Sequence, residues 1–98
     1  MKVLLNIIKT QDMTLINVCQ KELLGKIFRE GDLVLDVSEK FYGGELVEID
    51  YAFSLIDEAT VMSIVGNDAV EEAIKRGIVH KDSVLNIAGV KIAQVYNM

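Results

Sequence analysis

Residues 3–19, Val3-Leu4-Leu5-Asn6-Ile7-Ile8-Lys9-Thr10-Gln11-Asp12-Met13-Thr14-Leu15-Ile16-Asn17-Val18-Cys19, carry the pattern on which the predicted fold rests. Val3–Lys9 is apolar on both faces except at Asn6, which is typical of a strand inside a sheet. Thr10-Gln11-Asp12 has turn composition, and Met13–Cys19 follows as a second strand with two distinct faces. We therefore predict a hairpin with a three-residue loop at the start of the domain.

The remaining elements are predicted by working outward from this hairpin. A short helical turn is expected at Gln20–Leu24, closed by Gly25, and a half-buried strand is expected over residues 33–38. Helical periodicity covers Asp50–Thr60 and Asp68–Arg76, and an apolar strand, Val61–Val65, lies between them. Val84–Ile87 and Val90–Tyr96 read as a hairpin around Ala88-Gly89. The fold class is α/β or α+β: a single compact domain over residues 1–98, with a mixed sheet of about five to six strands and two main helices.

Finer features of the helices follow from residue spacing. Asp68 and Glu71 have the spacing of a capping box, and Gly77 occupies the position of a C-terminal glycine cap. Glu71–Lys75 and Glu72–Arg76 are predicted as ion pairs along the helix. The periodicity predicts a core of Leu5, Ile7, Leu15, Leu35, Val37, Phe53, Ile56, Val70 and Ile74, with Leu55 and Ala73 also buried.

Composition excludes several classes of protein. Apolar residues make up 51% of the chain and charged residues 26%, which is globular composition rather than that of a disordered chain. With one cysteine, Cys19, and one histidine, His80, neither an intramolecular disulfide nor a cysteine or two-histidine zinc site is possible. We therefore expect no metal and no cofactor. No stretch resembles a signal peptide or a membrane-spanning helix, so a cytoplasmic location and no membrane association are expected.

Charge is unevenly distributed along the chain. The net charge is −5, yet residues 30–72 contain twelve acidic residues and a single base, Lys40. A general affinity for nucleic-acid backbones is therefore not expected, since such binding depends on Lys and Arg neutralising phosphates. An acidic segment of this density instead predicts a basic protein or a ribonucleoprotein component as partner, with solubility as the simpler explanation.

Four motifs together resemble a known family: Glu22-Leu23-Leu24-Gly25-Lys26, Phe41-Tyr42-Gly43-Gly44-Glu45, Ile64-Val65-Gly66 before a helix, and Ala93-Gln94-Val95. Nearly the whole chain is similar to the small archaeal proteins grouped as domain of unknown function 424. That resemblance implies an archaeal, cytoplasmic, single-domain protein and a loose link to translation or another information-processing assembly, without a reaction. The family usually has a Pro-His pair where this chain has Lys91 and Ile92, which argues against a histidine-dependent activity here.

The stretch Phe41-Tyr42-Gly43-Gly44-Glu45, hereafter the FYGGE segment, is the candidate binding surface, with Lys26 and Gln94 as further candidates. Two adjacent glycines predict a loop that a ligand or partner backbone can approach closely, and Tyr42 offers a rigid ring with a polar tip. The alternative is that Phe41 fills the core and the glycines only make a turn. Similarly, Gln94 can contact a ligand or simply face solvent. The strand–Gly66–helix arrangement could bind a phosphate, but Asn67 and Asp68 are more simply explained as helix caps.

No nucleophile–base pair, metal cluster or phosphate-binding loop is evident, so no catalytic residue is assigned and a non-catalytic interaction module is the favoured interpretation. Glu39, Glu45 and Glu48 flank Tyr42 and would form an acidic rim for a basic partner. The alternative function is a small-molecule-binding protein or small enzyme with its site at the FYGGE segment.

Overall fold

The predicted N-terminal hairpin is confirmed in the computed structural model, which describes residues 1–97. Strand β1 (Lys2–Lys9) pairs antiparallel with β2 (Thr14–Cys19), and Leu5 lies opposite Val18. The loop is one residue longer than predicted, because Met13 lies outside β2 and its carbonyl accepts a hydrogen bond from the Thr10 N–H at 2.9 Å.

Strands β1 and β2 lie inside a six-stranded mixed sheet with the order β5-β1-β2-β6-β8-β7. The other members are β5 (Glu45–Glu48), β6 (Val61–Val65), β7 (Leu85–Ile87) and β8 (Val90–Tyr96). The β2–β6 pair is parallel, whereas the remaining pairs are antiparallel. The predicted C-terminal hairpin is confirmed, and both of its turn residues, Ala88 and Gly89, have positive φ, as a two-residue hairpin turn requires. The chain is thus a single α+β domain.

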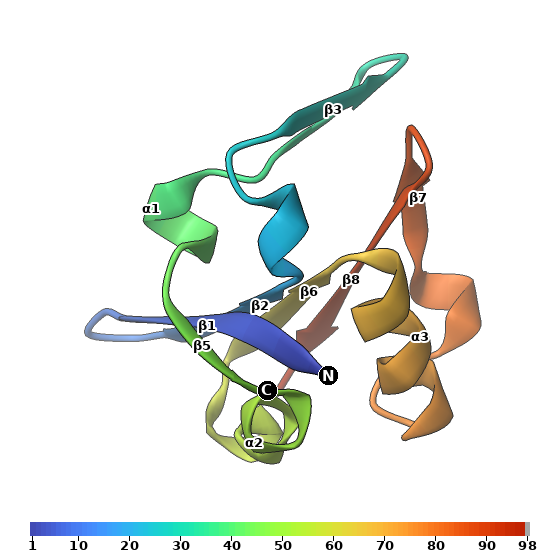
Figure 1. The fold of residues 1–98 in the computed structure, drawn as a ribbon. Coiled ribbons are helices and arrows are strands. Elements are labelled where there is room, and N and C mark those ends of the chain that lie inside the picture. Colours follow the sequence, from blue (N-terminus) through green and yellow to red (C-terminus); the bar gives the residue numbers. More distant parts are fainter. Residues whose placement is uncertain (98) are drawn as a thin grey trace.

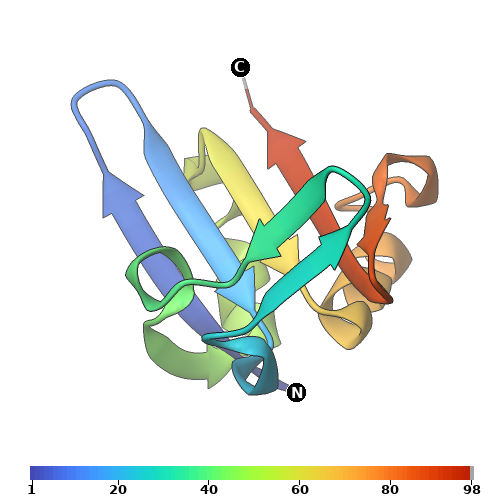
Figure 2. The ribbon, with the colours of Figure 1, turned by 90° about the horizontal axis from the view of Figure 1, so that it is seen from above.

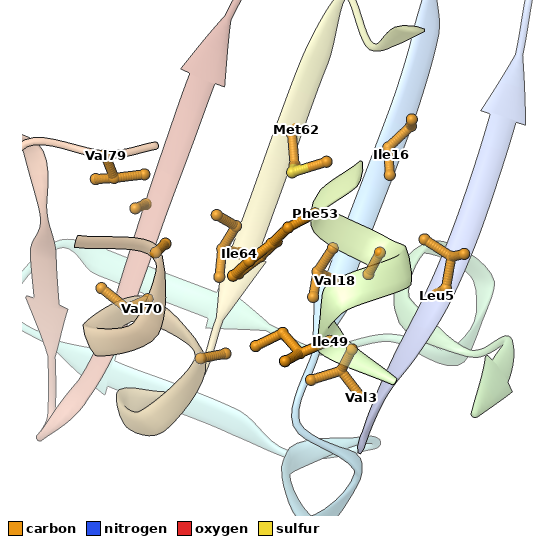
Figure 3. Close-up of a cluster of buried hydrophobic side chains, with 14 of the residues drawn as sticks. Val3, Leu5, Ile16, Val18, Ile49, Phe53, Met62, Ile64, Val70 and Val79 are labelled. Carbon is orange, nitrogen blue, oxygen red and sulfur yellow. The ribbon is translucent and has the colours of Figure 1, made fainter. Parts of the chain in front are cut away.

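Helices cover one face of this sheet (Figures 1 and 3). Helix α2 (Ile49–Ser54) and helix α3 (Asn67–Lys75) pack on side chains from β1, β2, β6 and β8 and bury Phe53, Val70 and Ile64 among others. The single helix predicted over Asp50–Thr60 is wrong: α2 ends at Ser54 and a separate 3₁₀ turn, η2, covers Ile56–Glu58. The helix cannot continue to Thr60, because the Thr60 N–H donates to the carbonyl of Thr14 at the start of β2.

The opposite face is covered by the segment between β2 and β5. It contains the 3₁₀ turn η1 (Lys21–Leu23), the hairpin β3 (Ile27–Glu30)–β4 (Leu33–Asp36) and the single helical turn α1 (Glu39–Tyr42). Figure 2 shows the β3–β4 hairpin crossing over the sheet. It closes a second core cluster whose buried members are Leu4, Cys19, Leu35, Val37, Val65, Ile87 and Val90. The molecule therefore has three layers, and neither β3 nor β5 was predicted from the sequence.

Burial tests the predicted core residue by residue. The predicted burial is confirmed for Leu5, Leu35, Val37, Phe53, Val70 and Ala73, whereas Leu15, Leu55, Ile56 and Ile74 are only half-buried. The predicted burial of Ile7 is wrong, since this residue is 46% exposed. The reason is local: β5 pairs only with residues 2–5 of β1, so the C-terminal half of β1 extends beyond that neighbour.

Candidate functional site

The FYGGE segment is bound to the sheet rather than projecting as a free loop. The predicted loop is correct only for Gly43 and Gly44, since Phe41 and Tyr42 belong to α1 and Glu45 begins β5. The Asn17 amide donates to the Phe41 carbonyl at 2.7 Å, and the Asn6 amide donates to the Gly43 carbonyl. A Cβ at Gly44 would overlap the Leu5 carbonyl, so this glycine allows the chain to lie directly against β1.

Asn6 and Asn17 belong to a row of polar side chains that crosses four neighbouring strands. Strand register places Asn6 opposite Asn17, Asn17 opposite Ser63, and Ser63 opposite Gln94. Directly paired residues point to the same side of a sheet, so the four side chains share the face that the β3–β4 hairpin covers. We call these four residues the polar row.

Tyr42 of the FYGGE segment and Gln94 both lie close to Ser63 of the polar row. The Gln94 amide nitrogen Nε2 donates to the Ser63 hydroxyl at 3.2 Å, and the Tyr96 hydroxyl donates to Gln94 Oε1 at 2.6 Å. Burial raises the pKa of Tyr42 above its usual range, the nearby Cys19 adds to that rise, and a hydrogen bond with Ser63 opposes it. The structure thus brings Tyr42 and Gln94, two of the predicted site residues, close to the same buried residue, Ser63.

The other predicted site residues do not belong to this group around Ser63. The Phe41 side chain is 45% exposed and does not fill the core. Lys26 is exposed at the base of the β3–β4 hairpin, where its carbonyl accepts from the Val37 N–H at 2.9 Å. Glu45 lies opposite Leu5 and therefore points to the helix-covered face.

The carboxylates expected to form an acidic rim are also separated. Glu45 and Glu48 are three residues apart on β5, so they point to opposite faces of the sheet. Glu39 belongs to α1, and Glu48 lies 4.0 Å from the N-terminal amine. These three side chains therefore do not share one face.

An apolar cleft, hereafter the β4–β8 cleft, opens where the β3–β4 hairpin crosses above β7 and β8. Its volume is about 520 Å³, and Leu33, Val34, Leu35, Ser83, Leu85, Ile87, Ile92, Ala93, Gln94 and Tyr96 line it. Four of the lining residues are unusually exposed for large apolar side chains: Leu33, Val34, Leu85 and Tyr96, at 45–64%. Sequence reasoning found only Gln94 of this set. The feature of the sequence that could have indicated the cleft is the pair of apolar residues, Leu33 and Val34, beside a turn.

Acidic residues outnumber basic ones among the sequence and register neighbours of the cleft's lining residues, although Arg29 lies opposite Val34 and Lys81 precedes Asp82. Glu30 lies opposite Leu33 in the hairpin, Asp32 precedes Leu33, and Asp82 precedes Ser83. Glu30 Oε1 also accepts a hydrogen bond from the Ala88 N–H at 2.8 Å, which links the hairpin to the β7–β8 turn. One nearby cation, Lys91, is directed to the helix side, where it pairs with Glu71.

The N–H groups after Gly66, which could have bound a phosphate, are instead bound by a side chain of the protein itself. Gln20 is buried, and its Oε1 accepts from the N–H groups of Asp68 at 2.8 Å and Ala69 at 3.0 Å. The predicted capping box is therefore wrong, since an amide from the β2–η1 junction satisfies these donors instead of Asp68. A Cβ at Gly66 would overlap Gln20, so this glycine makes room for the cap.

Two predicted ion pairs have different outcomes. Arg76 binds Glu72 at 3.0 Å as predicted and also reaches Asp50, while Glu71 pairs with Lys91 rather than Lys75. Within residues 1–97, no group of three or more His, Cys, Asp or Glu side chains is arranged to hold a metal ion. No helix in this part of the chain is both long and apolar enough to cross a membrane.

Cys19 is fully buried at the end of β2. Burial raises the pKa of its thiol to about 12, and the Glu22 carboxylate contributes to the rise. A thiol that stays protonated at neutral pH is a poor nucleophile, so Cys19 has the character of a packing residue.

Comparison with known proteins gives one structural and one family match. The structure superposes with a TM-score of 0.80 on the crystal structure of an uncharacterized conserved protein from Methanopyrus kandleri, which is 30% identical. The match covers 98% of this chain and 91% of that one. No curated protein matches this sequence. The family model described as "Protein of unknown function (DUF424)" matches residues 8–98, and the chain therefore belongs to the DUF424 family.

Proposed function

We propose that this protein is a non-catalytic interaction module that binds a basic protein partner through the β4–β8 cleft. The observation that carries this proposal is the gathering of exposed Leu33, Val34, Leu85 and Tyr96 in a single cleft. Exposed apolar residues are ordinary when scattered, but contiguous apolar surface with a polar rim is typical of interaction sites.

The chemistry of the partner follows from the rim. Glu30, Asp32 and Asp82 adjoin lining residues, Arg29 lies opposite Val34, and the protein as a whole has a net charge of −5, so the balance near the cleft is acidic. His80 lies next to Asp82, and its Nδ1 accepts a hydrogen bond from the Asp82 N–H at 3.1 Å. An apolar segment flanked by Lys or Arg would complement such a surface and would be steered toward it.

The alternative, a small-molecule or enzymatic site at the FYGGE segment, has less support. The carbonyls of Phe41 and Gly43 are already bound by Asn17 and Asn6, and packing against β1 accounts for Gly44. No specific feature of the segment favours a substrate.

A display library of random dodecapeptides, selected on the immobilised full chain, tests the proposal. We expect enrichment of peptides that combine apolar residues with Lys or Arg. Leu85→Glu, which places a charge in the cleft, should lower the affinity for a selected peptide by roughly tenfold or more. Apolar contact is lost, and a charge is desolvated when the peptide binds.

Ile27→Glu is the matched control, since Ile27 is 52% exposed, close to the 56% of Leu85, but does not line the cleft. This variant should bind the peptide as the parent does. Equal binding by the Leu85→Glu variant, or a failure to enrich any basic apolar family, would contradict the proposal.

A further inference from the structure

The Gln94 side chain is held in a fixed orientation within the β4–β8 cleft. Its Nε2 donates to Ser63 and its Oε1 accepts from Tyr96, so both ends of the carboxamide are restrained. Ser63 is itself buried, which fixes the position of the group that Gln94 contacts. A glutamine on a strand surface normally samples many rotamers, whereas this one is tied down by residues from β6 and β8.

These restraints leave part of the carboxamide free. A glutamine amide has two N–H donors and an oxygen with two lone pairs, and the structure uses one of each. Gln94 is exposed and lines the cleft, so its remaining donor and acceptor are open to a bound molecule. One donor beside one acceptor on a planar group is the hydrogen-bonding pattern of a peptide bond.

The surroundings of Gln94 suit an extended chain. Leu33 and Leu35 of the hairpin face the sheet on one side, and Leu85 and Ile87 lie on the other. In an extended peptide every second side chain points the same way, so the apolar side chains on one side of the peptide can enter the cleft. The backbone between them would then reach the polar floor that Gln94 provides, which is the division of roles seen when strands bind to proteins.

From this geometry we infer that Gln94 recognises the backbone of an extended, basic-flanked apolar peptide, with Ser63 and Tyr96 acting as positioning residues. The inference rests on the proposed function and names the form in which the partner binds. Recognition of a backbone amide makes binding tolerant of side-chain identity at that position, while the acidic rim and the apolar walls select the flanking residues.

The test uses the tightest peptide selected from the dodecapeptide library. Each of its backbone amides is N-methylated in turn, which removes one N–H donor while keeping the side chain. We expect one position at which methylation weakens binding to the parent protein by about threefold to tenfold, the value of a single hydrogen bond. The same methylation should have no effect on binding to the Gln94→Leu variant, because the acceptor is already absent.

Controls separate a failure of this inference from a failure of the proposed function. Tyr96→Phe removes the bond to Gln94 Oε1 but keeps the ring, and it should lower the sensitivity to N-methylation without abolishing binding.

If Leu85→Glu blocks the peptide but Gln94→Leu binds it as the parent does, the cleft is the docking site and our inference about Gln94 is wrong. If N-methylation lowers the affinity equally for the parent and for Gln94→Leu, Gln94 does not bind the peptide backbone. The peptide then binds as a helix or through its side chains alone, and the inference is wrong. If Leu85→Glu has no effect, the proposed function itself fails.

Discussion

Gln20 shows how a single side chain can connect distant parts of this fold. It follows β2, yet its amide oxygen satisfies two N–H groups at the start of α3, 48 and 49 residues away in sequence. Its Nε2 also donates to Glu22 at 2.7 Å. The cap therefore ties the η1 turn on one face of the sheet to the helix on the other.

Replacing Gln20 by Ala should lower the free energy of unfolding by about 1–2 kcal/mol, since two buried helix donors lose their acceptor. Asp68→Ala is the informative control, because no side-chain bond from Asp68 caps the helix. It should cost roughly 0.5 kcal/mol or less. Urea denaturation of both variants measures the difference, and a larger loss for Asp68→Ala would show that the capping box operates after all.

The buried thiol of Cys19 predicts a loss of stability in alkali. Burial raises its pKa to about 12 in the folded protein, against 9.0 for an ordinary thiol. Between these values the folded state keeps a proton that the unfolded state releases. The thiol's contribution is therefore complete below pH 9 and declines by about 1.4 kcal/mol per pH unit above it.

The Cys19→Ala variant removes this contribution together with the part of the Tyr42 pKa rise that Cys19 causes, and both changes make its stability depend less on pH. Its cavity should give a constant deficit in stability below pH 9, and that deficit should shrink as the pH rises toward 11. Urea titrations at pH 8, 10 and 11 provide the comparison. A deficit that stays constant over this range would contradict the raised pKa.

The β3–β4 hairpin is the element that creates the cleft, and its two faces differ sharply. Leu35 points to the sheet and is 5% exposed, while its neighbour Val34 is 52% exposed. Leu35 and Phe28 are paired across the hairpin, and both pack into the second core cluster. The hairpin is thus anchored by one face while its opposite face and edge stay open.

We expect Leu35→Ala to destabilise the protein by about 2–5 kcal/mol, because a cavity would form in the second cluster. Val34→Ala, one residue away, should change stability by roughly 0.5 kcal/mol or less. Thermal or urea unfolding of the pair tests whether the hairpin is an integral layer. Similar small losses for both would mean that the hairpin does not pack on the sheet.

Local pattern was enough to predict most elements of this fold. The N- and C-terminal hairpins, β6 and α3 follow from alternation, turn residues and helical period, which are short-range signals. Strand β5 escaped prediction because its Leu46 and Val47 are flanked by glutamates and glycines, so its apolar content is too small to stand out. The end of the helix at Ser54 depends on Thr60 bonding to Thr14, a long-range contact that periodicity cannot reveal.

At the scale of the molecule, the candidate site was only partly accessible to sequence reasoning. Tyr42 and Gln94 were identified as candidates, but their shared position close to Ser63 depends on β2 and β6 pairing in parallel, which no short-range signal predicts. The β4–β8 cleft forms because the tip of the hairpin reaches over β8 toward β7 (Figure 2). Its walls come from segments about fifty residues apart, so their exposed apolar residues appear unrelated along the chain.

The central claim, that the β4–β8 cleft is the docking surface, is tested most directly by titrating the ¹⁵N-labelled full chain with the selected basic apolar peptide and following amide chemical shifts. The account predicts that the largest shifts fall on residues 33–35, 85–87 and 92–96, while the amides of α2 and α3 on the opposite face change little. Shifts concentrated on α2 and α3, or on the FYGGE segment without the cleft, would contradict it.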